Sequence, residues 1–185
     1  MDVVKTNVEK IGGNVDVNTT VGSGSIFKLQ IPLTLAVIDG LIVLSENQRY
    51  VVPLNQVQET LNLKTQKLFT DKTGIGSCID LRGSVVPLVH IDDALGIKKN
   101  AKFNENDTAL IVNVQDRQMA LVIKDIVRAQ QIVVKPFSNG IISQRGWVGS
   151  CVLGDGMPTL IISPTDILKG KIKENNIENN LRGAA

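Results

Sequence analysis

The stretch LIVLSENQRYVVPL, residues 41–54, is the most informative about the fold because it recurs later in the chain. At a sequence offset of 69 it aligns with LIVNVQDRQMALVI, residues 110–123. In both copies an apolar run, a polar turn and a second apolar run follow one another, which is the pattern of a β-hairpin. A further match, at an offset of 72, aligns residues 81–84 with residues 153–156. Because strands and turns recur in one order over half the chain, the sequence predicts an internal duplication.

Short apolar runs separated by polar turns fill the whole of residues 34–170. Apolar residues make up 43% of the sequence but aromatic residues only 3%, so Val, Ile and Leu must build the core. The β-branched residues Val and Ile favour strands, and regularly spaced short strands are typical of a barrel or sandwich. Each copy of the repeat ends in a short helical pattern, at residues 91–96 and 163–170. We therefore expect a mainly β fold with two small β-barrels in tandem.

The N-terminal residues follow a different pattern. Apolar residues at helical spacing predict a helix over residues 1–11, which Gly12-Gly13 ends. Two strand-like runs, residues 14–19 and 26–31, are joined by a Gly-rich turn and predict a hairpin.

Pro32 separates this segment from the repeat. The tail after residue 170 is polar and rich in Asn, so we expect it to be flexible. The sequence thus predicts three parts, residues 1–33, 34–170 and 171–185.

Composition and charge weigh against several functional classes. The net charge is +2 with no run of five like charges, whereas nucleic-acid binding needs a basic patch, so we expect no nucleic-acid partner. Cys78 and Cys151 form no ligand-spaced cluster and are expected to be small buried residues. The start of the chain lacks a secretory signal, and no apolar run approaches the ~20 residues of a membrane span. We expect a cytoplasmic protein without direct membrane insertion.

Few residues suggest catalysis or metal binding. The one histidine, His90, follows an apolar run and has no evident catalytic helper, so a strand-end residue is the favoured interpretation. Asp92-Asp93 has no third acid or histidine nearby, and we expect Asp92 to cap a helix rather than bind a metal. Asp155-Gly156 is typical of a tight turn. No metal site is predicted.

A Gly-rich bend at Gly22-Ser23-Gly24-Ser25 is the only phosphate-like signal in the sequence. Backbone N–H groups in such a bend can cradle an anion. An ordinary hairpin turn explains the same residues equally well.

Residues 21–40 (VGSGSIFKLQIPLTLAVIDG) closely resemble the last glycine box of the ATP-binding domain of CheA chemotaxis kinases and the passage that follows it. Residues 1–13 resemble the helix after the nucleotide lid in that family. Ser25 stands where the family usually has Thr. The resemblance implies that residues 1–33 are a truncated helix–hairpin remnant of an α+β kinase domain, with Gly22, Gly24 and Ser25 left from its nucleotide site.

The remainder resembles the CheW-like regulatory domain of the same family. Four passages carry the match: residues 49–54, 81–88, 130–136 and 153–156. The resemblance implies two tandem SH3-like β-barrels, in agreement with the duplication.

The family resemblance also implies a role in two-component signal transduction. In the full-length kinase this domain docks the coupling protein CheW and the cytoplasmic tips of chemoreceptors, and receptor state thereby controls autophosphorylation and the phosphorelay. It implies a location at receptor arrays on the inner face of the membrane. The phospho-accepting His domain, the dimerisation helices and most of the ATP site have no counterpart here. We therefore expect no kinase activity and no cofactor for this chain, although ATP and Mg serve the full-length family.

Other functions compete with this interpretation. A free-standing CheW-type adaptor would share the repeat, but the kinase-like segment at positions 1–31 counts against it. An independent ATP-binding enzyme would need the opposite wall of the nucleotide pocket. A nucleic-acid-binding barrel would need a stacking platform, whereas the aromatic side chains are dispersed along the sequence.

Arg82-Gly83 is the candidate for partner binding. The pair lies in a polar turn between the apolar runs 79–81 and 85–89. A solvated turn, with Gly83 present for its backbone freedom, explains the pair without a function. The resemblance favours the alternative that Arg82 reaches a carboxylate on the coupling protein or receptor.

Overall fold

The structure is a computed structural model that describes residues 2–10, 13–30, 37–46, 48–71, 76–99, 101–137 and 146–171. The chain divides into two compact units, residues 1–37 and 38–185, and each is described by itself. The predicted tail, apart from Lys171, lies outside the described residues.

The first unit is a helix followed by a hairpin, as the sequence predicts. Helix α1 (Asp2–Lys10) ends where the Gly13 N–H donates to the Val8 carbonyl, 2.9 Å away. Strands β1 (Asn14–Thr20) and β2 (Gly24–Gln30) pair antiparallel throughout their length. Nearly every described side chain of this hairpin is exposed, apolar ones included.

The second unit consists of twelve strands in two halves of the chain, among its described residues. The strands of the first half are β3 (Val37–Ser45), β4 (Gln48–Pro53), β5 (Glu59–Asn62), β6 (Leu68–Asp71), β7 (Gly76–Leu81) and β8 (Ser84–His90). Those of the second half are β9 (Thr108–Val114), β10 (Arg117–Ile123), β11 (Asp125–Val133), β12 (Lys135–Pro136), β13 (Trp147–Val152) and β14 (Pro158–Ile162). Helix α2 (Ile91–Ala94) closes the first half and a helix over residues 164–171 closes the second. Within the described ranges, the first half alone has 3₁₀ turns, η1 (Leu54–Gln56) and η2 (Leu63–Thr65).

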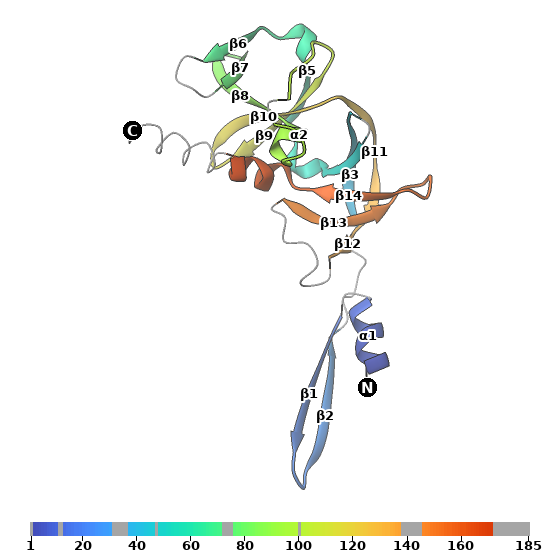
Figure 1. The fold of residues 1–185 in the computed structure, drawn as a ribbon. Coiled ribbons are helices and arrows are strands. Elements are labelled where there is room, and N and C mark those ends of the chain that lie inside the picture. The colour runs from blue at the N-terminus through green and yellow to red at the C-terminus, as the bar shows by residue number, and fades with distance from the viewer. Residues whose placement is uncertain are drawn as a thin grey trace. The chain divides into compact units, whose positions relative to one another are not determined.

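The strands form two six-stranded sheets of equivalent order, β5-β9-β10-β8-β7-β6 and β11-β3-β4-β14-β13-β12. The mainly β fold and the internal duplication are therefore confirmed. The sheets add one feature to the predicted tandem arrangement. The hairpin that opens each half is inserted into the sheet of the other half. As paired among the described residues, neither sheet closes into a ring. Figure 1 shows β5–β8 gathered at one end of this unit and β12–β14 at the other, with β9, β10 and α2 between them.

The exchanged hairpins explain the continuous apolar runs of residues 41–54 and 110–123. Alternate residues of β3 and β4 face a core shared by both sheets, and the residues between them face a smaller core of the second sheet. Strands β9 and β10 divide their side chains in the same way between the shared core and the first sheet. A strand buried on both faces carries apolar residues at every position, so the two hairpins lie at the centre of the unit.

Candidate partner-binding surfaces

The Gly-rich bend of the first unit is an open hairpin turn. Gly22 and Gly24 have φ values of 81° and 100°, and a Cβ built on either would meet nothing within 4 Å. Both are therefore needed for their backbone conformation rather than for close approach to another group. The Ser25 hydroxyl lies 3.0 Å from that of Thr19 across the hairpin. These exposed residues alone do not fit a nucleotide site.

The β7–β8 turn holds both residues predicted to bind a partner. Leu81 pairs with Ser84, so Arg82 and Gly83 form a tight turn between them, with φ values of 53° and 84°. Positive φ at both positions is the type I′ geometry that suits the twist of a hairpin. The Asp80 carboxylate accepts the Gly83 N–H at 2.8 Å and fixes the turn.

The Arg82 side chain is 79% exposed and reaches across to another strand of the first sheet. Its Nη2 donates to Glu59 Oε2 on β5, at 2.9 Å. Because this ion pair is exposed, it contributes little to stability, and the guanidinium can exchange Glu59 for another carboxylate.

An apolar surface lies near this turn on the outer face of β6–β8. Phe69 is opposite Cys78, and Cys78 is opposite Pro87, so the three residues share one face. Val85, two positions before Pro87, lies on the same face and is 57% exposed, while Phe69 is also exposed. We call Phe69, Val85 and Pro87 the β6–β8 patch. Apolar residues and arginine are both enriched in protein interfaces, so the β6–β8 patch and Arg82 together suit contact with a partner protein.

The turn equivalent to Arg82-Gly83 in the second half is Gly154-Asp155-Gly156. Arg49 Nη1 donates to Asp155 Oδ2 at 2.5 Å, and the Met157 N–H donates to Asp155 Oδ1 at 3.1 Å. The Met157 N–H, and after it the Arg49 guanidinium, holds the pKa of Asp155 below its ordinary value. The predicted tight turn is thus present and is tied to β4.

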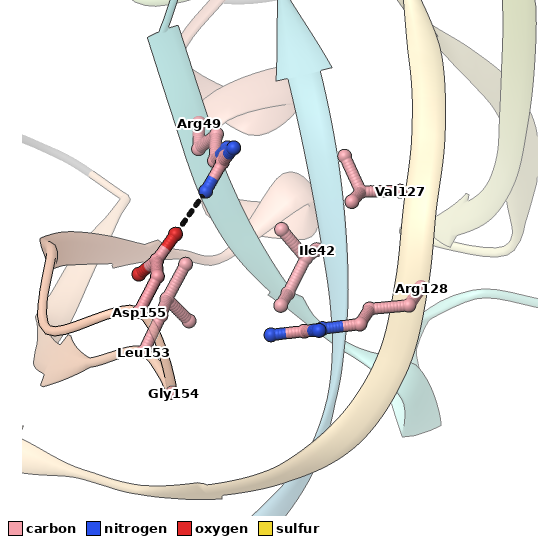
Figure 2. Close-up of a pocket in the computed structure, with 7 residues that line it drawn as sticks. All are labelled: Ile42, Arg49, Val127, Arg128, Leu153, Gly154 and Asp155. Atoms are coloured by element: carbon pink, nitrogen blue, oxygen red, sulfur yellow. Dashed lines mark hydrogen bonds and ion pairs between the residues drawn. The ribbon is translucent and has the colours of Figure 1, made fainter.

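A hollow of about 390 Å³ opens beside this turn, and we call it the arginine hollow. Figure 2 shows Ile42 and Leu153 among its lining residues, with the Arg49–Asp155 pair on one side and Arg128 extending from β11 on the other. Ile42 and Leu153 are buried members of the second sheet's core. Sequence reasoning missed this hollow, because only the exchange of β3 and β4 into the second sheet brings its residues together.

The His90–Asp92 region differs in part from its prediction. His90 ends β8, as expected, but it is His90 rather than Asp92 that caps α2, since its Nδ1 accepts the Asp92 N–H at 3.2 Å. Asp92 is buried and its Oδ1 accepts the Ser45 hydroxyl at 2.5 Å. Its Oδ2 accepts no hydrogen bond from any described residue. The predicted cap is therefore wrong, because burial of α2 turns Asp92 inward against the end of β3.

The remaining predictions concern the two cysteines, metal binding and membrane spans. Cys78 and Cys151 are buried thiols, as predicted. Within the described ranges no three His, Cys, Asp or Glu side chains gather where they could hold a metal ion. The helices in the described part of the chain are too short or too polar to span a membrane.

Comparison with known proteins identifies the second unit. Residues 39–171 match the family described as the CheW-like domain. The chain is 35% identical over 162 residues to a chemotaxis protein CheA of Borreliella burgdorferi, covering 88% of this chain and 18% of that one. It is 33% identical over 162 residues to a sensor histidine kinase CheAY of Helicobacter pylori, covering 88% and 20%. The match to the CheA of Treponema pallidum spans the whole chain at 28% identity and covers 22% of that protein.

The chain thus spans about a fifth of the length of these relatives. Among solved structures it resembles the scaffolding protein CheW of Thermoanaerobacter tengcongensis, with a TM-score of 0.58 and 17% identity, covering 70% of this chain and 91% of that one. The fold, the family match over residues 39–171 and the curated relatives agree with the resemblance seen in the sequence. The chain therefore belongs to the family of CheW-like domains and corresponds to the C-terminal region of CheA-type chemotaxis kinases.

Proposed function

We propose that this chain is the regulatory and scaffolding module of a chemotaxis sensor kinase. It binds a CheW-type coupling protein and the cytoplasmic tips of chemoreceptors at receptor arrays, and so controls autophosphorylation of the kinase. The observation that carries the proposal is the type I′ turn at Arg82-Gly83 beside the β6–β8 patch, of which Phe69 and Val85 are exposed, in a chain that matches CheA proteins.

The β7–β8 turn and the β6–β8 patch supply complementary parts of an interface. Apolar contact by Phe69, Val85 and Pro87 removes water from the centre, and Arg82 at its edge selects a partner carboxylate. Arg82 already holds Glu59, which fixes its direction before binding. The partner carboxylate then replaces Glu59 or shares the guanidinium with it.

Binding of the immobilised chain to a coupling protein and to a receptor-tip fragment tests this proposal. We expect both to bind, and Arg82→Ala to weaken at least one at least tenfold, about 1.4 kcal/mol, with almost no change in thermal stability. Glu59→Gln is the matched variant, since it breaks the internal ion pair but keeps Arg82, and it should bind at least as well as the parent. Arg117→Ala, at the start of β10, controls for loss of an exposed arginine.

The outcomes separate the site from the function. If the parent chain binds neither protein, the proposed function is wrong. If the parent binds but Arg82→Ala stays within twofold for both partners, the function stands and the contact lies elsewhere.

We also propose that the chain by itself neither binds ATP with useful affinity nor transfers phosphate. Gly22 lies in the exposed turn and Gly24 and Ser25 begin β2 directly after it, so these residues could contact only part of a phosphate chain. Calorimetric titration with ATP and magnesium should give no defined site. Sub-millimolar binding at a defined site would refute this part of the proposal.

A free-standing CheW-type adaptor is the second candidate, favoured by the match to 91% of the Thermoanaerobacter CheW scaffold. An adaptor docks on the CheW-like domain of a kinase, whereas a kinase module docks on the coupling protein. The affinity of the chain for a coupling protein, compared with its affinity for the CheW-like domain of a kinase, distinguishes these roles. A kinase module should bind the coupling protein more tightly.

A further inference from the structure

The two halves of the duplicated unit differ in charge at equivalent positions. The repeat offset of 69 places Arg128 of β11 on Glu59 of β5, and the offset of 72 places Gly154 on Arg82. In the first half Arg82 and Glu59 form an ion pair at 2.9 Å. In the second half the arginine, Arg128, lies on the strand, and the residue on the turn is Gly154, which has no side chain.

Arg128 lies where this ion pair would form but has no partner among the described residues. A Cβ built on Gly154 would lie 3.8 Å from Arg128 Nη2, so the guanidinium extends to the turn itself, as Figure 2 shows. No described residue forms a hydrogen bond or an ion pair with Arg128. Asp155, the acid in the turn, uses Oδ2 for Arg49 and Oδ1 for the Met157 N–H. The described part of the chain thus supplies a cation at this site without a carboxylate to pair with it.

The arginine hollow has a composition that suits one acidic side chain from outside. Arg49 and Arg128 are positive and Asp155 is negative, so one positive charge is in excess among its lining residues. Val127 is exposed and offers apolar contact to the methylene groups of an acid or to a neighbouring apolar residue, while Ile42 and Leu153 line the hollow as buried apolar residues. A volume of about 390 Å³ admits a side chain together with part of its backbone.

We propose that the arginine hollow is a second docking site, which receives an Asp or Glu side chain, flanked by an apolar residue, from a partner protein. The partner carboxylate pairs with Arg128 as Glu59 pairs with Arg82 in the first half. This deepens the proposed function and rests on it for the class of partner. The unit would thus contact partners through equivalent turns of both halves, with arginine on the turn in one and on the strand in the other.

Titration of the isotope-labelled chain with acetyl-Leu-Glu-Leu-amide reads the hollow without any partner protein. We expect the methyl resonances of Ile42 and Leu153 and the Arg128 Nε–H resonance to shift, with weak affinity because a single ion pair is formed. The Gln peptide should cause far smaller shifts, and Arg128→Gln should abolish the effect of the Glu peptide. Absence of shifts with the Glu peptide, or equal shifts with the Gln peptide, overturns the proposal.

Free glutarate distinguishes the source of the carboxylate. If glutarate binds as tightly as the peptide, the hollow accepts free dicarboxylates and the proposal that a partner protein supplies the carboxylate is wrong. If only the peptide binds, a protein segment is supported.

Partner binding gives the second measurement. Arg128→Glu should weaken binding of the coupling protein or the receptor fragment at least tenfold, while the charge-matched Arg117→Glu stays within threefold. Retained binding of both partners by Arg128→Glu overturns the docking role. Failure of the parent chain to bind either partner contradicts the proposed function, and the peptide titration then decides the arginine hollow independently.

Discussion

Ser45→Ala tests how the exchanged hairpin is held. Ser45 ends β3, which lies in the second sheet, and Asp92 lies in α2, which follows β8 of the first sheet. The Ser45 hydroxyl donates to Asp92 Oδ1 at 2.5 Å, and Asp92 is 4% exposed. The substitution removes this donor and leaves both oxygens of a buried carboxylate without a hydrogen bond among the described residues.

The expected loss follows from the charge of the acceptor. A hydrogen bond to a charged group contributes about 1.5–3 kcal/mol, and a neutral one about 0.5–1.5 kcal/mol. We expect Ser45→Ala to lower the free energy of unfolding by about 2–3 kcal/mol at neutral pH. For a chain of this size that corresponds to a fall in Tm of roughly 5–10 °C.

Urea unfolding followed by circular dichroism measures this loss. In the Asp92→Asn background the same serine substitution should cost only about 1 kcal/mol, because the acceptor is neutral. Ser150→Ala, at a half-buried serine in β13, is the control and should change stability by less than about 0.5 kcal/mol. A loss below that limit for Ser45→Ala, or an equal loss in both backgrounds, would show that the Ser45–Asp92 hydrogen bond does not stabilise the unit in this way.

Three further predictions concern separate parts of the chain. The carboxyl of Asp155 should titrate below its ordinary pKa by NMR, and Arg49→Gln should raise the value only in part, because the stronger cause, the Met157 N–H, remains. Because folding lowers this pKa, the ionised Asp155 stabilises the folded chain fully at pH values above the ordinary Asp pKa, and this stabilisation is lost as the pH falls through the lowered pKa. An Asp155 pKa that is normal or raised contradicts the described turn. Burial raises the pKa of the Cys151 thiol, so a thiol-reactive dye should label Cys151 slowly in the folded chain and rapidly in urea, and fast labelling of the native chain would be inconsistent with its burial. Amide hydrogens of β1 and β2 should exchange faster than those of β9 and β10, because an exposed two-stranded hairpin is marginal alone, and equal protection in a dilute monomer would count against this.

Much of the fold could be predicted because its signals are local or repeated. The helix and hairpin of residues 1–30 follow from apolar spacing and glycines, and the turn at Arg82-Gly83 follows from a short polar break between apolar runs. The duplication follows from the two repeat offsets, 69 and 72. These features require no knowledge of which strands pair at long range.

The exchange of hairpins could not be predicted in this way. An apolar run such as residues 41–54 indicates burial on both faces but does not identify the neighbouring strands. The arginine hollow depends on that exchange, since it joins Ile42 and Arg49 of one half to Arg128 and Leu153 of the other. A comparison of charges at the repeat offsets could have indicated Arg128, because it stands where the first half has Glu59.

The structural role of Asp92 could not be predicted from its neighbours in the sequence either. An acid at the start of a helix ordinarily caps it. His90 takes that place here, and the buried carboxylate instead accepts a long-range hydrogen bond from Ser45 and lies 3.5 Å from His90 Nδ1.

Titration of the isotope-labelled chain with unlabelled coupling protein tests the proposed function most directly, because it reports binding and location together. We expect resonances of Arg82, Gly83 and the β6–β8 patch to shift or broaden, while those of β1 and β2 do not change. Absence of change at excess coupling protein, or changes confined to residues 2–30, would contradict the assignment of this chain as a module that docks the coupling protein.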